Sequence, residues 1–334
     1  MITVVIPTYN QVECIRKIID TCVIPYRGNL FIFQVQDSSE TDIIQQIIER
    51  AIEIYTLTNL IYVRWPSGIS GDDKALQSIE QVDTEYFWLF GDGNLADFNA
   101  LEDFLIHHHY EIYDILNIEV IERIGHRGQD LDARVNYIYS YDDIVFYMKK
   151  YFSHLTYWGS SIVSRDFFAL AVDTNIIKKK YMEQNIPWWY ACLLCEAGDK
   201  AVSYQRSVHL GTFFSPYIAY NPMKLDHSWT HDERYYEFVF KKFSMAIDLL
   251  PSRYSGITYH ITEYFRKDAL VSYSYLLFLR SIGIINRNMI AKYDVYIKRV
   301  PKYRYILLFY SYLPQTVAKY MEWLKNTVKN ILKK

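Results

Sequence analysis

The sequence predicts an α/β protein: a doubly wound, mostly parallel sheet of the Rossmann-like, nucleotide-binding kind, followed by a C-terminal helical region. Strand-like and helix-like segments alternate through residues 1–95. The strand-like segments are apolar at consecutive positions, which is typical of parallel strands buried on both faces. From about Tyr235 the apolar residues follow helical spacing to the end. These observations predict a nucleotide-binding domain over residues 1–215 and a helical region over residues 216–334.

The elements of the first half follow from local pattern. Pro7 ends the first β-branched run, and apolar residues at three- and four-residue spacing mark the helices between strands. The expected strands are 2–6, 30–35, 60–63 and 86–90, and the expected helices are 11–22, a segment from Thr41, and 75–82.

The second half is less regular. Residues 137–150 are aromatic-rich without clear periodicity, 176–198 is expected to be helical with a break at Pro187, and 201–210 is expected to be a strand. The helical region is expected to break at Pro251, Pro301 and Pro314.

Composition excludes several classes of protein. With 51% hydrophobic and 22% charged residues in 334, the chain is expected to fold. A net charge of -2 argues against a dedicated nucleic-acid binder. Cys192 and Cys195 lie in an apolar, helix-like run and are expected to be buried thiols, not a zinc site. The start of the chain shows no secretory signal pattern, and we find no apolar run long enough to span a membrane, so a cytoplasmic protein is expected.

Polar motifs follow three of the expected strands: Thr3-Val4-Val5-Ile6-Pro7-Thr8-Tyr9-Asn10, Gln36-Asp37-Ser38-Ser39-Glu40-Thr41-Asp42 and Trp88-Leu89-Phe90-Gly91-Asp92-Gly93-Asn94. In an open parallel sheet, ligands bind beyond the carboxyl ends of the strands. These three motifs are therefore expected to meet at one binding site.

The three motifs in this order resemble the family-2 glycosyltransferases with the GT-A fold. The Phe-Gly-Asp-Gly-Asn signature is most similar to that of sugar transferases of bacterial surface-polysaccharide assembly, such as abequosyltransferases. The resemblance covers residues 1–95 well and weakens to about residue 210. It implies an inverting transfer of a hexosyl or deoxyhexosyl group from a UDP- or dTDP-sugar to a glycan or lipid-linked acceptor of capsule or O-antigen type, with Mn²⁺ or Mg²⁺ as cofactor.

The residues expected at the nucleotide-sugar site are Pro7, Thr8, Tyr9, Asn10, Asp37, Asp73, Lys74, Asp92 and Gly93. Asp37 is placed to accept from the base, Tyr9 to pack on base or ribose, and Asp92 to accept from the ribose. Several of these residues have an alternative role: Asp37 as a helix cap, residues 92–94 as an ordinary turn, and Lys74 as a solvated charge at a helix start instead of a phosphate contact.

Asp92 and Asn94 are the expected metal ligands, with His209 as a further ligand and His227 or His231 as weaker candidates. Asn94 stands where the family has a second carboxylate. Trp158 and Gly159 are expected beside the acceptor.

The catalytic base is not evident, because Ile186-Pro187 occupies the place where inverting members carry a carboxylate. Glu183 and Asp166 are the candidates from nearby segments, and Glu196 lies further along the chain. These departures leave a non-catalytic scaffold subunit of an assembly complex as the alternative. A nucleotidyltransferase is disfavoured, since Pro7-Thr8-Tyr9-Asn10 is not a glycine- and lysine-rich phosphate loop.

Residues 315–334 form an amphipathic pattern with five lysines and one acid, Glu322. This pattern predicts a helix that contacts an anionic membrane surface, which would make the protein peripheral to the cell membrane. Packing on the domain or pairing in an oligomer is the alternative, and the sequence leaves the oligomeric state open.

Overall fold

The computed structural model describes residues 1–120, 137–171, 178–186, 188–223, 232–256, 273–299 and 301–332. The chain divides into two compact units, residues 1–182 with 190–225 and residues 183–189 with 226–334. The first unit ends at residue 225, ten residues beyond the boundary expected from sequence. The reason is that residues 218–220 still pair with a strand of the first unit.

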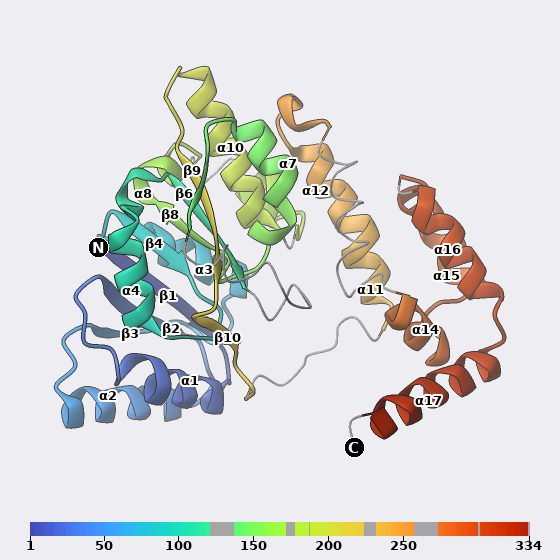
Figure 1. Ribbon diagram of the computed structural model, residues 1–334, viewed down its shortest axis with the longest axis horizontal. Helices are drawn as coiled ribbons and strands as arrows, with labels where there is room; N and C mark the ends of the chain where they lie inside the picture. Colours follow the sequence, from blue (N-terminus) through green and yellow to red (C-terminus); the bar gives the residue numbers. More distant parts are fainter. Residues whose placement is uncertain are drawn as a thin grey trace. The chain divides into compact units, whose positions relative to one another are not determined.

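The first unit contains the following elements (Figure 1). Its strands are β1 (Ile2–Thr8), β2 (Phe31–Asp37), β3 (Leu60–Arg64), β4 (Tyr86–Leu89), β5 (Asn94–Ala96), β6 (Ile115–Val120), β7 (Tyr139–Tyr141), β8 (Ser161–Ser164), β9 (Leu210–Ser215) and β10 (Ile218–Tyr220). Its α-helices are α1 (Val12–Ile18), α2 (Ile43–Tyr55), α3 (Gly71–Glu80), α4 (Phe98–His107), α7 (Ile144–Leu155), α8 (Arg165–Ala169) and α10 (Trp189–Ser203). A π-helical segment, η1 (Ile19–Val23), prolongs α1.

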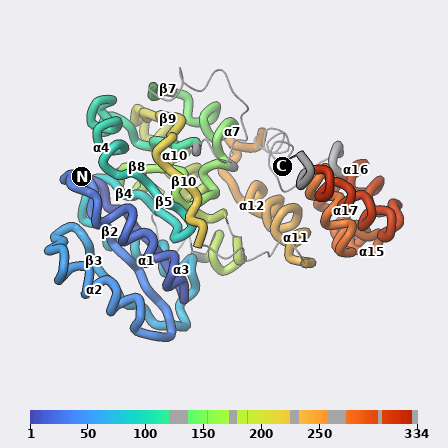
Figure 2. Tube along the Cα trace, turned by 60° about the horizontal axis from the view of Figure 1, so that its bottom comes forward, coloured from blue at the N-terminus to red at the C-terminus, as the bar shows by residue number. Residues whose placement is uncertain are grey.

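Within the described residues, eight strands form one sheet in the order β3-β2-β1-β4-β8-β6-β9-β7. β1, β2, β3, β4, β6 and β9 run parallel to one another, whereas β8 and β7 are antiparallel to their neighbours. β5 and β10 form a separate antiparallel pair, seen side by side in Figure 2. The predicted mixed α/β fold with a mostly parallel sheet is confirmed.

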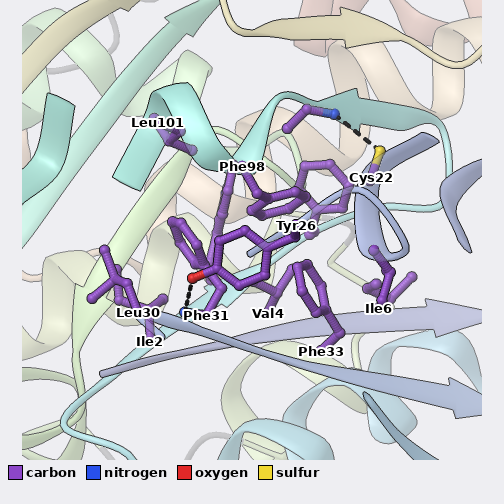
Figure 3. Packing of buried hydrophobic residues seen from close by; sticks show 14 of the residues in the cluster. Ile2, Val4, Ile6, Cys22, Tyr26, Leu30, Phe31, Phe33, Phe98 and Leu101 are labelled. Atoms are coloured by element: carbon purple, nitrogen blue, oxygen red, sulfur yellow. Dashed lines mark hydrogen bonds between the residues drawn. The ribbon is translucent and has the colours of Figure 1, made fainter. Parts of the chain in front are cut away.

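The main core lies between the sheet and the helices α1, α2 and α4. Alternate residues of β1, such as Val4, face this core, whereas α3 packs against β1 and β4 from the other side. Phe98 of α4 meets Phe31 and Phe33 edge to face, at ring-centroid distances of 4.9 and 4.7 Å. Figure 3 shows this aromatic cluster around Tyr26, whose hydroxyl accepts a hydrogen bond from the Phe31 N–H. Truncating such a phenylalanine to alanine typically costs about 3–5 kcal/mol.

Two segments differ from the sequence prediction. The expected strand 201–210 does not form, because α10 continues to Ser203 with Ala197 and Ala201 one turn apart on its buried face, and β9 begins only at Leu210. The segment 137–150 is not irregular: it forms β7 and the start of α7, whose first N–H groups are capped by Asp143. All four cysteines are buried free thiols, which confirms the expectation for Cys192 and Cys195.

The second unit is helical in its described residues. It contains α11 (Arg234–Tyr236), α12 (Phe243–Leu249), α14 (Tyr273–Ser281), α15 (Arg287–Ile297), α16 (Pro301–Tyr312) and α17 (Gln315–Leu332), with a π-helical segment η5 (Glu237–Lys242) between the first two. Pro301 begins α16, where its missing N–H costs nothing, and Pro314 separates α16 from α17. Tyr236 stacks on Tyr293 with ring centroids 5.4 Å apart. None of the helices in the described residues combines the length and the hydropathy that a membrane span requires.

Candidate functional site

The three predicted motifs meet at the carboxyl edge of the sheet, because β1, β2 and β4 are parallel neighbours. The Thr8 hydroxyl donates to Asp92 Oδ2 at 3.1 Å, which joins the first motif to the third. The Ser38 N–H donates to the Thr8 carbonyl at 3.3 Å, which joins the first motif to the second. Thr8 is buried, and its hydroxyl and carbonyl therefore connect all three loops.

Beyond Pro7 and Thr8, the chain turns sharply at Asn10, whose φ is 54°. Asparagine tolerates this left-handed conformation because its short amide makes local hydrogen bonds. Here the Asn10 N–H donates to Ser39 Oγ at 2.8 Å, and its side-chain oxygen accepts from the Glu40 N–H at 3.2 Å. Tyr9 lies half-exposed beside this turn, with its hydroxyl donating to Glu40. The ring of Tyr9 is therefore accessible at the edge where a ligand is expected.

Asp37 is completely buried at the end of β2, and both of its carboxylate oxygens have protein partners. Oδ1 accepts from the Ser39 N–H at 2.8 Å, and Oδ2 accepts from the Tyr62 hydroxyl and from Arg64, each at 3.0 Å. The alternative of helix capping is not realised, since Asp37 bonds no N–H of α2. In this arrangement Asp37 fixes its own loop to β3, and a base would have to displace one of these partners to reach it.

Lys74 lies at the centre of the cluster, with 2% of its surface exposed. Its ammonium donates to the Thr8 carbonyl and to Ser38 Oγ, at 2.7 Å for the latter. Burial lowers the pKa of Lys74 to about 8, and the negative charges of Asp37 and Asp92 oppose that fall. The alternative of a solvated charge at a helix start is wrong. Lys74 is a buried cation held between the first two motifs.

Asp73, the residue before it, has a local role in the helix. Ser70 is the N-cap of α3: its hydroxyl oxygen accepts from the Asp73 N–H at 3.0 Å and donates to the Asp73 carboxylate at 2.7 Å. The N-cap and this second bond between the same two side chains fix the first turn of α3 and thereby the position of Lys74.

The turn at residues 91–94 is joined to the predicted acceptor segment. The Asn94 side-chain nitrogen donates to the carbonyls of Gly91 and Trp158, both at 3.1 Å, and the Gly159 N–H donates to the Leu89 carbonyl at 2.6 Å. Gly159 has φ of +98°, and a Cβ there would lie 2.7 Å from the Asn94 nitrogen. Only glycine satisfies both conditions. Trp158 and Gly159 thus lie directly beside the turn that carries Asp92.

Asn221 is a site residue that the sequence did not indicate. It is fully buried after β10, and its amide nitrogen donates to the Asp92 carbonyl at 3.0 Å and to the Cys14 carbonyl at 3.1 Å. Its own N–H donates to the Gly93 carbonyl at 2.8 Å. An asparagine after a short aromatic segment carries no local signal of this role, which depends on the return of the chain from β9.

Glu119 is a second such residue. It is half-buried near the carboxyl end of β6, and Ile118 beside it donates its N–H to the Ser160 carbonyl at 2.7 Å, next to Gly159. Thr212 on β9 lies 3.5 Å from its carboxylate. Glu119 is thus a carboxylate on the same edge of the sheet as the three motifs.

Two predicted residues lie at the opposite edge of the sheet, and those assignments are corrected. His209 precedes β9 instead of ending a strand, and its N–H donates to Asp114 at 2.9 Å, just before β6 begins. Asp166 follows β8, which runs antiparallel to β4, so that Ser164 pairs with Tyr86 at the start of β4. Neither can serve as metal ligand or base at the carboxyl edge.

The remaining candidates stand as follows. Glu183 is exposed and belongs to the second unit. Glu196 is held in an ion pair with Lys180 and accepts from the Tyr181 hydroxyl at 2.5 Å. His227, His231 and Pro187 lie outside the described residues.

The fit of a divalent cation rests on Asp92 and Asn94. Among the described residues there is no group of three or more histidine, cysteine, aspartate or glutamate side chains that could hold a metal ion. The Asn94 amide nitrogen donates to two carbonyls, and an amide ligates a cation through its oxygen, so that oxygen and the carboxylate of Asp92 in the same turn are the candidate ligand atoms. One carboxylate, one amide oxygen and substrate phosphates are a donor set that Mg²⁺ commonly uses. The residues therefore fit a cation that is shared with a diphosphate.

No protein-family model matches the chain, and no curated protein matches it significantly in sequence. Solved structures do match. One is Staphylococcus aureus TarS 1–349 in complex with UDP-GlcNAc, with 14% identity, coverage of 91% of this chain and 91% of that one, and a TM-score of 0.52. Another is the mannosyltransferase PcManGT from Pyrobaculum calidifontis in complex with GDP-Man and Mn²⁺, with 13% identity, coverage of 100% and 87%, and a TM-score of 0.50. At this identity the likeness concerns the fold, and the chain has a GT-A-type fold.

Proposed function

We propose that this protein transfers a sugar from a UDP- or dTDP-sugar to a glycan or lipid-linked acceptor in surface-polysaccharide assembly. The observation that carries the proposal is the convergence of the three strand-end motifs around the buried Lys74, with Asp92 beside it. A cation enclosed at the carboxyl edge of a parallel sheet provides charge for a diphosphate. The two similar structures, TarS and PcManGT, are complexes with UDP-GlcNAc and GDP-Man, which supports the same class of donor here.

Each residue has a role in this proposal. Tyr9 packs on the base or ribose with its accessible ring, and Asp37 contacts the base after exchanging one partner. Lys74 lies on the phosphate side, while Asp92 and Asn94 hold Mn²⁺ or Mg²⁺ together with the diphosphate. The metal would neutralise the leaving diphosphate.

The acceptor side is formed by Trp158 and Gly159. Glu119 is a candidate for the base that deprotonates the acceptor hydroxyl, in place of Asp166, because it lies at the same edge as the donor motifs; Glu183 remains the other candidate. A Glu119→Gln variant is then expected to bind UDP normally but to release UDP from a UDP-sugar at least a hundredfold more slowly in the presence of acceptor. Equal rates would exclude Glu119 as the base.

The donor site is tested by calorimetric titration of UDP and dTDP, with and without Mn²⁺. Asp92→Asn is the sharpest variant, because the amide keeps an oxygen for the Thr8 hydroxyl and removes only the charge. Asp83, exposed before β4, gives the matched control Asp83→Asn. We expect binding that is at least tenfold weaker in Asp92→Asn and unchanged in Asp83→Asn. If neither nucleotide binds in any condition, the proposal fails, and a scaffold role becomes the better explanation.

A further inference from the structure

Helix α17 packs on the second unit through its small and polar side. Ala318 is fully buried, and Gln315 donates to the Ser281 carbonyl at the end of α14, at 3.0 Å. Arg280 donates to the Leu313 carbonyl at 2.7 Å and fixes the turn that precedes the helix. These contacts, which position α17 against α14, come from small and polar side chains and from the backbone.

The large apolar side chains of α17 form a stripe that is exposed instead of buried. The stripe consists of Val317, Tyr320, Met321, Leu324 and Val328, which are 42–61% exposed. Their spacing of three and four residues places them on one face of the helix. In a globular domain such a face normally turns toward the core. The described residues of the unit therefore leave about half of this face open to solvent.

Aromatic side chains of the second unit are exposed as well. Trp323 is 59% exposed and stacks on Tyr320, with ring centroids 5.9 Å apart. On α16, Tyr305, Phe309 and Tyr312 form a second exposed row at helical spacing. Tryptophan and tyrosine favour the boundary between water and lipid, because each combines an apolar ring with a polar group.

The charge of the segment indicates the partner. Residues 315–334 carry Lys319, Lys325, Lys329, Lys333 and Lys334 against Glu322, a net charge of +4 in a chain whose total is -2. Glu322 is itself paired with Lys325 at 2.5 Å. A second copy of the chain would bring the same positive charge to the contact, whereas an anionic lipid surface is complementary to it. Because no described helix can span a membrane, the fitting arrangement is a helix lying in the interface plane.

We propose that α17 is a membrane-docking helix, which inserts the stripe at Val317, Tyr320, Met321, Leu324 and Val328 into the headgroup region of an anionic bilayer. This inference rests on the second unit alone and is independent of the donor site.

The test is flotation of the full chain with phosphatidylcholine vesicles that contain or lack phosphatidylglycerol. The double variant Met321→Ser/Leu324→Ser removes apolar side chains that the fold leaves exposed. Ile54→Ser/Ile106→Ser, at 55% and 53% exposure on α2 and α4, is the matched control. We expect the original chain to bind vesicles that contain phosphatidylglycerol. Binding should be at least tenfold weaker when the vesicles lack this lipid, and at least tenfold weaker for the double variant. The control variant should bind as the original chain does.

Depth is measured by quenching of tryptophan fluorescence with brominated phosphatidylglycerol, which should be reduced in Trp323→Phe. Absence of binding, equal binding to both vesicle types, or undiminished binding of the double variant would overturn the proposal. A concentration-dependent dimer that the double variant abolishes, with no lipid binding, would show that a second copy covers this face instead.

Discussion

The buried ammonium of Lys74 gives the most direct test of the site geometry. A lysine side chain is rarely enclosed, and here its charge lies within hydrogen-bond reach of the Thr8 carbonyl and Ser38 Oγ. Lys74→Met keeps the length of the side chain and removes the charge. The variant therefore buries a side chain of similar length, and its free energy of unfolding can be compared directly with that of the original chain.

The magnitude follows from the pKa of Lys74, which burial lowers from 10.5 to about 8. This difference means that folding disfavours the protonated form of Lys74, relative to the neutral form, by about 3 kcal/mol. Because the folded pKa is below the unfolded one, the unfolded chain binds more protons between these values. The contribution of Lys74 to the free energy of unfolding therefore rises with pH through this window and is lost as pH falls through about 8.

The assay is urea unfolding of the original chain and Lys74→Met at pH 7 and about pH 9.5, without nucleotide and with a chelator present. At pH 7 the variant no longer has the cost of a buried charge, but it also lacks two hydrogen bonds. The informative quantity is therefore how the difference in free energy of unfolding between the two proteins changes with pH. We expect the original chain to gain about 2 kcal/mol relative to the variant over this range. Lys179→Met, at an exposed position, should show no such change. A difference that stays within about 0.5 kcal/mol would refute a buried, charged Lys74.

Other consequences are equally accessible. Gly159→Ala should lower the free energy of unfolding by about 2 kcal/mol and weaken UDP binding. The added Cβ would contact Asn94, and the backbone conformation at this position disfavours any side chain. The control Gly68→Ala, where the Cβ would meet open space, should leave the thermal unfolding temperature unchanged. Asn221→Ala should cost about 2–3 kcal/mol, since it removes two buried hydrogen bonds, and calorimetry should show weaker UDP binding because the turn at Asp92 loses its support. The four thiols should be inert toward Ellman's reagent at pH 8 until urea is added, because all of them are buried. Burial also raises the pKa of Cys22, Cys192 and Cys195. Fast labelling of the native protein would contradict this prediction.

Local pattern was sufficient for the strands and helices of residues 1–90. The apolar strands with polar residues at their ends predicted a parallel sheet and the convergence of Thr8, Asp37 and Asp92, and the sheet type is confirmed. Such prediction works because strand burial and helix spacing are written in neighbouring residues. The same pattern could not tell whether Lys74 is enclosed, since burial depends on which loops close over it.

The tertiary structure decided which distant residues share an edge. Residues 201–210 contain β-forming side chains, yet α10 continues to Ser203 and β9 begins at Leu210. His209 therefore lies before the start of a strand, whereas the sequence had predicted it at the end of one. Asp166 was misplaced because β8 runs antiparallel, and strand direction leaves no trace in local sequence. In the same way only the return of β10 brings Asn221 to the turn at Asp92.

What the sequence by itself determined is the order of elements, the strand-end motifs and the amphipathic character of residues 315–334. What only the tertiary structure decided is direction: which edge each strand end faces, and which side of α17 packs inward. The physical reason is that periodicity fixes which residues share a face of an element, whereas contacts distant in sequence, such as Gln315 with Ser281, select the face that is buried.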